Sequence, residues 1–165
     1  MVKRDDKFNP PTSLSAAQEL WKNNRRDFVL WALSLVDAKP KPKGEDVDGI
    51  LGFVETGNKK QFILVRATGA PLVPGMMQDL TNATDDEGAA IGLLISLREP
   101  NRGLIADSVH AGSYQSELWK RKFLKIQIRT VQELLDGKSF DIPQTYSLVR
   151  KKARVKKRGE TAQLL

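Results

Sequence analysis

Hydrophobic and polar residues alternate near the middle of the chain in a pattern that predicts a β-hairpin. The segment V-D-G-I-L-G-F-V-E (47–55) is typical of one strand, T-G-N of a tight turn, and K-K-Q-F-I-L-V-R-A (59–67) of a second strand. The apolar run 62–65 predicts that the second strand is central and buried on both faces. Because alternate residues of a strand share a face, we expect Leu64 and Arg66 to point the same way.

Apolar residues at helical spacing predict helices at 12–24, 25–37, 75–86, 102–111 and 131–137. Thr130 and Glu133 form a capping box at the start of the last of these. A near-continuous apolar run predicts a buried parallel strand at 89–97, and strict alternation predicts another strand at 123–128. These elements together indicate an α/β fold with a central mixed sheet flanked by helices.

The chain length of 165 residues fits one domain with a sizeable core. Hydrophobic residues make up 40% of the sequence, but no apolar run approaches the roughly 20 residues that a membrane span requires. The start M-V-K-R-D-D-K-F contains acids and no apolar segment, so we expect neither a secretory signal nor membrane attachment. The absence of cysteine excludes disulfides and thiolate metal sites, and it is compatible with the cytoplasmic location that we expect.

Positive charge is concentrated at the carboxyl end of the chain. The formal net charge is +7, and the segment R-K-K-A-R-V-K-K-R (150–158) carries seven cations and no acid, so the remainder is about neutral. We therefore divide the chain into a domain at 1–149 and a basic tail at 150–165. The cations of the tail are Arg150, Lys151, Lys152, Arg154, Lys156, Lys157 and Arg158. Clustered cations bind nucleic-acid phosphates by releasing counterions, although a solvated terminus has the same composition.

A second group of cations precedes the hairpin. The segment K-P-K-P-K-G-E-D (39–46) is rich in proline and cannot continue a helix, so we expect an exposed loop at the rim of any site. Its lysines, Lys39, Lys41 and Lys43, are candidate phosphate contacts together with Arg66.

The hairpin resembles the core of the PD-(D/E)xK restriction-endonuclease fold, and in particular the Mrr-type domains attached to bacterial DNA methyltransferases. The resemblance covers most of the chain from about Leu14 to the basic tail. It rests on the order and spacing of F-V-L-W-A-L-S-L-V-D-A-K-P, G-E-D-V-D-G, E-P-N-R-G-L-I-A-D-S-V-H-A-G-S-Y and I-Q-I-R-T-V-Q-E-L-L-D-G-K. It implies a restriction-endonuclease-like three-layer fold and Mg²⁺-dependent cleavage of DNA.

The sequence departs from the catalytic motif of that family at three positions. Asp48 matches the motif aspartate, but Leu64 stands where an acid or Gln is expected and Arg66 where a Lys is expected. Relatives often carry Gln or Glu where this chain has Val29. Leucine has no lone pair to offer a metal, and an arginine side chain stays protonated, so it cannot accept a proton. Asp48 and Arg66 are therefore the vestigial catalytic candidates.

Mg²⁺ prefers oxygen ligands in octahedral geometry, usually one or two carboxylates with waters and phosphate oxygens. Asp48 supplies one carboxylate, and Asp46 or Glu45 lies near enough in sequence to supply a second. Glu55 lies seven residues beyond Asp48, about 20 Å away along a regular strand and on its opposite face. His110 has no second ligand near it in sequence, so we assign it no metal or base role.

Three hypotheses follow. The first is a DNA-binding domain with degenerate catalysis, linked to restriction-modification, which we favour because it requires no compensating ligand. The second is an active Mg²⁺-dependent endonuclease that uses Glu45 or Asp46, and the third is a protein-interaction module. The resemblance also implies a DNA methyltransferase as partner or parent chain, and analogy implies a homodimer.

Overall fold

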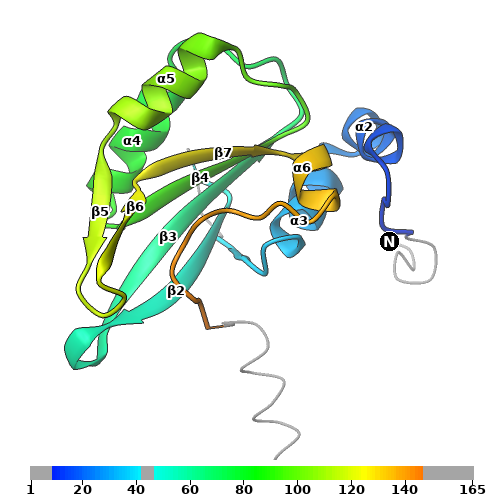
Figure 1. Ribbon diagram of the computed structural model, residues 1–165. Coiled ribbons are helices and arrows are strands. Elements are labelled where there is room, and N and C mark those ends of the chain that lie inside the picture. Colours follow the sequence, from blue (N-terminus) through cyan, green and yellow to red (C-terminus); the bar gives the residue numbers. More distant parts are fainter. Residues whose placement is uncertain (1–8, 42–46, 147–165) are drawn as a thin grey trace, which may run out of the picture.

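A five-stranded mixed sheet forms the centre of the protein, whose computed structural model describes residues 9–41 and 47–146 (Figure 1). The strand order is β1-β2-β3-β4-β7. The strands are β1 (Lys39–Pro40), β2 (Gly49–Glu55), β3 (Lys59–Thr68), β4 (Ile91–Ser96) and β7 (Ile126–Thr130). β2 pairs antiparallel with β1 and with β3. β4 pairs in parallel with β3 and with β7. The expected α/β class with a mixed sheet is confirmed.

Helices cover both faces of this sheet (Figure 1). One side carries α2 (Leu14–Asn23), α3 (Arg25–Ser34) and the short α6 (Val131–Leu135), and the other carries α4 (Met76–Asp86) and α5 (Arg102–His110). The Thr130 side chain and the Glu133 carboxylate form the expected capping box at α6. Within the described ranges, no helix has the length and apolarity needed to cross a membrane.

Asn24 joins α2 to α3 and thereby fixes the start of α3. Its backbone N–H donates to the Leu20 carbonyl at 2.8 Å and so closes α2. Its side-chain oxygen accepts from the Asp27 N–H at 3.1 Å and so caps α3. An extended asparagine that ends one helix and begins the next turns the chain sharply, because neither helix can continue through it.

The two sheet faces have separate apolar layers. Phe28, Trp31 and Leu33 of α3 pack towards β2, β3 and β4, while Met77 and Leu80 of α4 pack towards β4 and β7. Gly92 lets α4 approach β4 closely, since a Cβ at this position would meet the Thr84 hydroxyl, Leu80 and Ile126. The central strands are therefore buried from both sides.

The prediction of one continuous strand at 123–128 is wrong, because the chain there passes from one sheet to another. β6 (Arg121–Leu124) pairs antiparallel with β5 (Ser113–Ser116) in a separate two-stranded sheet, and β7 belongs to the main sheet. Lys125 lies between them. Its N–H donates to the Gly112 carbonyl at 2.9 Å, and its carbonyl accepts from the Gly92 N–H at 2.8 Å. Unbroken alternation across Lys125 concealed this change of partner.

Three further expectations require correction. Phe62 is 37% exposed, because the pairing of β3 with β4 begins one residue later at Ile63. The second helix ends at Ser34 rather than near 37. Lys39 and Pro40 of the expected loop pair with β2 as the edge strand β1.

Candidate nucleic-acid interface around Asp48

The β2–β3 hairpin has the expected form and brings Asp48 to the end of the ladder. A turn at Thr56–Asn58 (η1), with Gly57 at a φ of 72°, joins the strands, and Gly49 pairs with Val65 at the other end. Asp48 immediately precedes the last pair, Gly49 with Val65, and the charge of Arg66 acts on its carboxyl group. The motif positions 48 and 66 therefore lie close enough in space to interact electrostatically.

Asp48 is hydrogen-bonded to β3 through two of its polar groups and to Lys41, which follows β1, through a third. Its backbone N–H donates to the Val65 carbonyl at 2.8 Å, and its carbonyl accepts from the Lys41 N–H at 2.9 Å. Its carboxylate Oδ2 accepts from the Ala67 N–H at 2.8 Å. The side chain thus replaces a backbone acceptor where the β2 ladder has ended, which is a structural role.

Burial raises the pKa of Asp48 above its ordinary value, while the Ala67 hydrogen bond and the positive charge of Arg66 act in the opposite direction. The net rise means that the folded protein disfavours the charged carboxylate relative to the unfolded chain. Stability contributed by the protonated form is therefore lost as pH rises through the ordinary pKa of 3.8 towards the folded value.

We expect Asp48→Asn to raise the melting temperature at neutral pH and Asp48→Ala to lower it. Asparagine keeps an oxygen that accepts from the Ala67 N–H and carries no charge to desolvate, whereas alanine leaves that N–H without its acceptor. Thermal unfolding at pH 7 and pH 3 measures both effects, and the gain from asparagine should shrink at pH 3. An Asn variant as unstable as the Ala variant would contradict this account.

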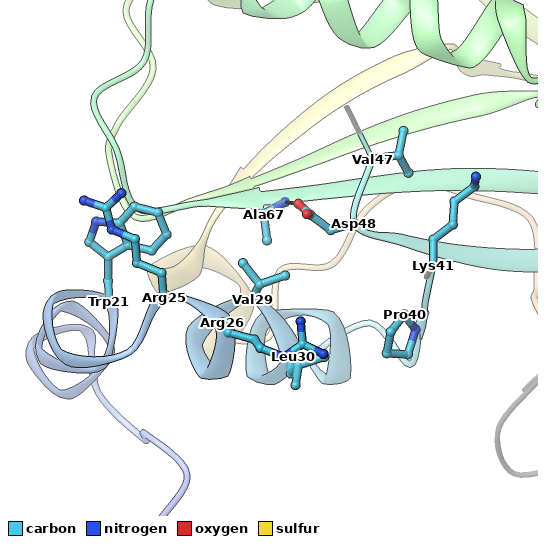
Figure 2. Close-up of a pocket in the computed structure, with 10 residues that line it drawn as sticks. All are labelled: Trp21, Arg25, Arg26, Val29, Leu30, Pro40, Lys41, Val47, Asp48 and Ala67. Atoms are coloured by element: carbon cyan, nitrogen blue, oxygen red, sulfur yellow. Dashed lines mark hydrogen bonds between the residues drawn. The ribbon is translucent and has the colours of Figure 1, made fainter. Parts of the chain in front are cut away.

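A cavity of about 390 Å³ opens between α3 and this end of the sheet (Figure 2). Asp48 and Ala67 form one wall, and Val29 and Leu30 of α3 form the other. Figure 2 shows Arg25 beside Trp21 at one end and Lys41 at the other. The Arg25 guanidinium carbon lies 4.6 Å from the centre of the Trp21 ring, a cation–π contact that orients this side chain.

Cations outnumber acids in the cavity lining. Arg25, Arg26 and Lys41 line it with a single carboxylate, that of Asp48. Lys41 also forms a long ion pair with Glu87, 3.7 Å between Nζ and Oε1. A concave site with this charge attracts anions, and guanidinium groups bind phosphate oxygens in a bidentate manner.

Leu64 belongs to the core. It is 1% exposed and lies across from Ile50 on β2 and Gly92 on β4. Arg66, two residues further along β3, is half-buried and shares the face of Leu64, opposite to the face of Ala67.

The described residues around Asp48 do not fit a Mg²⁺ site. Of the three motif positions, only Asp48 offers a carboxylate, and one oxygen of that carboxylate is occupied by a backbone N–H. Across the residues that the structure describes, no group of three or more His, Cys, Asp or Glu side chains is arranged to hold a metal. Glu45 and Asp46, the candidate relocated ligands, lie outside the described residues.

The candidate phosphate contacts fall into three groups. Lys41 and Arg66 lie at the Asp48 end of the hairpin, and Lys39 is exposed on the neighbouring edge strand. Lys43 and the cations of the tail lie outside the described residues. Glu55 lies at the far end of β2 from Asp48, as expected.

Sequence reasoning missed Arg25 and Arg26. They occupy the first turn of α3, where the helix dipole disfavours cations. Two arginines at an unfavourable position are the signal that could have identified them.

In comparisons with known proteins, no family model, curated protein or solved structure matches this chain.

Proposed function

We propose that this chain is a DNA-binding domain of the restriction-endonuclease-like, Mrr type, linked to restriction-modification, in which the metal-dependent cleavage site is degenerate. The observation that carries the proposal is that Arg25, Arg26 and Asp48 line one cavity at the end of the hairpin. The sequence resemblance supports the same reading, since it places the family's site at this end.

Phosphate binding explains features that folding does not require. Arginines in the first turn of α3 oppose the helix dipole, at a cost of about 0.3–1 kcal/mol each. A phosphate group in the cavity would offset that cost through charge-assisted hydrogen bonds. The sequence adds the seven cations of 150–158, which would extend contact along the DNA backbone.

The side chains at the motif positions support the proposal of degenerate catalysis. Leu64 is a core residue without a ligand atom, and Arg66 remains protonated and can grip a phosphate without accepting a proton. The Asp48 carboxylate accepts a hydrogen bond from the Ala67 N–H and so stabilises the end of β3. We derive no hydrolytic step at this site.

We further infer a DNA methyltransferase as a functional partner, in the same chain or in another. A homodimer is part of this proposal, because two-fold symmetric DNA sites favour two-fold symmetric proteins.

We expect the double variant Arg25→Gln/Arg26→Gln to bind duplex DNA about tenfold more weakly at low salt. Losing two phosphate contacts should also reduce the slope of log affinity against log salt by about 1.8. Fluorescence anisotropy of a labelled duplex across a salt series measures both quantities. Arg102→Gln is the matched control, because Arg102 is an exposed arginine in the first turn of α5 on the opposite sheet face.

Deletion of 150–165 tests the basic tail in the same assay and should also weaken binding and flatten the salt dependence. Unchanged duplex affinity in both the deletion and the arginine double variant would refute the proposal. No duplex binding by the intact protein at physiological salt would instead favour the protein-interaction module.

The active endonuclease remains the second candidate, because Asp48 presents a carboxylate to a cation-lined cavity. Plasmid nicking in Mg²⁺ or Mn²⁺ that is abolished by Asp48→Ala would establish it. Duplex binding without nicking in either metal would decide for the degenerate domain.

A further inference from the structure

Two hairpin ends meet at the far end of β2 from Asp48. The β2–β3 turn and the β5–β6 loop lie side by side there (Figure 1), and the Thr56 hydroxyl donates to the Glu117 carboxylate at 3.0 Å. We call residues 56–60 and 117–122 together the hairpin tip. A regular β2 places this tip about 20 Å from Asp48, so it is a separate surface from the cavity.

Glu55 holds the β5–β6 loop in one conformation. This carboxylate is 5% exposed, accepts from the Leu118 N–H at 3.0 Å and accepts from the Tyr114 hydroxyl at 2.6 Å. Although burial raises its pKa, hydrogen bonds from Ser116, Tyr114, Leu118 and Thr56 lower it to about 2, so Glu55 is ionised at neutral pH. A buried anion with several donors is a rigid anchor for the loop.

The anchored loop presents large apolar side chains to solvent. Leu118 is 47% exposed and Trp119 is 42% exposed. The Trp119 N–H donates to the Ser116 hydroxyl at 3.1 Å, which fixes the backbone at the tryptophan itself. Lys120 adopts a φ of 54°, a left-handed conformation that costs a lysine roughly 1–2 kcal/mol. The loop that exposes the tryptophan therefore contains one residue in the left-handed conformation that often closes short hairpin loops.

Four exposed lysines belong to the same hairpin tip. Lys59 and Lys60 follow the β2–β3 turn, Lys120 ends the loop, and Lys122 lies on β6, all of them exposed. Arg121 is already paired with Asp141 at 2.6 Å. The one exposed acid among the tip residues is Glu117.

We propose that the hairpin tip binds single-stranded or locally unpaired nucleic acid, with a base stacked on Trp119 and phosphates on the lysines of the tip. Exposed aromatic rings within a cationic groove are the combination by which proteins hold unpaired strands, because every base offers a flat face and every linkage a negative charge. This surface goes beyond the proposed duplex contact at the Asp48 cavity.

An anionic membrane surface is the alternative ligand for a surface that combines lysines with an exposed tryptophan. Interfacial binding strength scales with the apolar area that enters the bilayer. The tip offers two large apolar side chains, Leu118 and Trp119, and they are carried by a loop rather than by an apolar helix face. The charge and the single aromatic ring therefore fit an unpaired strand better.

The test measures binding of a labelled thymidine oligonucleotide of about 12 residues to the full-length protein by anisotropy and by quenching of tryptophan fluorescence. We expect Trp119→Ala to weaken binding about tenfold and Trp119→Phe, which keeps an aromatic face, to weaken it less than threefold. Lys59→Gln/Lys60→Gln should reduce the salt slope by about 1.4. Val73→Ala, which truncates a residue that is 51% exposed elsewhere, is the matched control and should bind like the parent.

Unchanged oligonucleotide affinity in Trp119→Ala would overturn the proposal. So would binding to vesicles containing phosphatidylserine, lost in Trp119→Ala, by a protein that does not bind the oligonucleotide. The Arg25→Gln/Arg26→Gln variant distinguishes the two surfaces, because it should lose duplex affinity and retain single-strand affinity. Trp119→Ala should show the reverse.

Discussion

Leu64→Glu should destabilise the domain by about 3–5 kcal/mol, the effect of an uncompensated charge in the interior. Leu64 is 1% exposed and lies between β2 and β4, so a carboxylate there would be removed from solvent. Urea unfolding monitored by circular dichroism measures the change. The result bears on function because Leu64 occupies the position where the endonuclease motif expects an acid or Gln.

The control for this prediction is Leu64→Met, which preserves volume and should cost less than about 1.5 kcal/mol. If Leu64→Glu folded with the stability of the parent, the site would already contain a compensating cation or solvent. Plasmid nicking by such a variant in Mg²⁺ would then show that one side chain separates this domain from an active enzyme.

Glu55→Gln should cost about 2 kcal/mol, because hydrogen bonds to an ionised acceptor are worth about 1.5–3 kcal/mol. The Leu118 N–H and the Tyr114 hydroxyl would both lose their charged acceptor. The hydrogen bond to Glu55 also raises the pKa of Tyr114, after the larger effect of its burial, so the pair should remain tyrosine and carboxylate throughout the neutral range.

The same residue predicts a pH dependence. The folded pKa of Glu55 is about 2, below its ordinary 4.5, so its contribution to stability is complete above 4.5 and is lost as pH falls towards 2. Melting temperatures should therefore fall more steeply between these pH values in the parent than in Glu55→Gln. Glu117→Gln, an exposed acid of the same loop, should change stability by less than about 0.5 kcal/mol. Equal pH profiles for the parent and Glu55→Gln would contradict the assignment.

Local sequence signals located the elements that depend on neighbours in the chain. The turn at Thr56–Asn58 and the capping box of Thr130 with Glu133 are set by residues within four positions of each other, and both occur as expected. The split at Lys125 was missed because alternation reports which face a side chain takes and not which strand lies beside it.

Only the part of the candidate site that depends on local pairing could be predicted from the sequence. Asp48 and Arg66 lie at the same end of the hairpin, which the short-range pairing of its strands predicts. Arg25 and Arg26 come from a helix that packs across the sheet, so their proximity to Asp48 depends on tertiary structure. The hairpin tip likewise needs Glu55 and Leu118, which are distant in sequence and joined by one hydrogen bond.

The position of Lys125 between the two sheets also bears on how the protein unfolds. Lys125 donates its N–H to the Gly112 carbonyl just before β5, and its carbonyl accepts from the Gly92 N–H of β4, so one residue links the segment leading into the small sheet to the central sheet. Detaching the small sheet would leave the Lys125 N–H, next to the first residue of the edge strand β7, without its acceptor. We therefore expect the two sheets to unfold together, which hydrogen exchange of the Lys125 N–H would report.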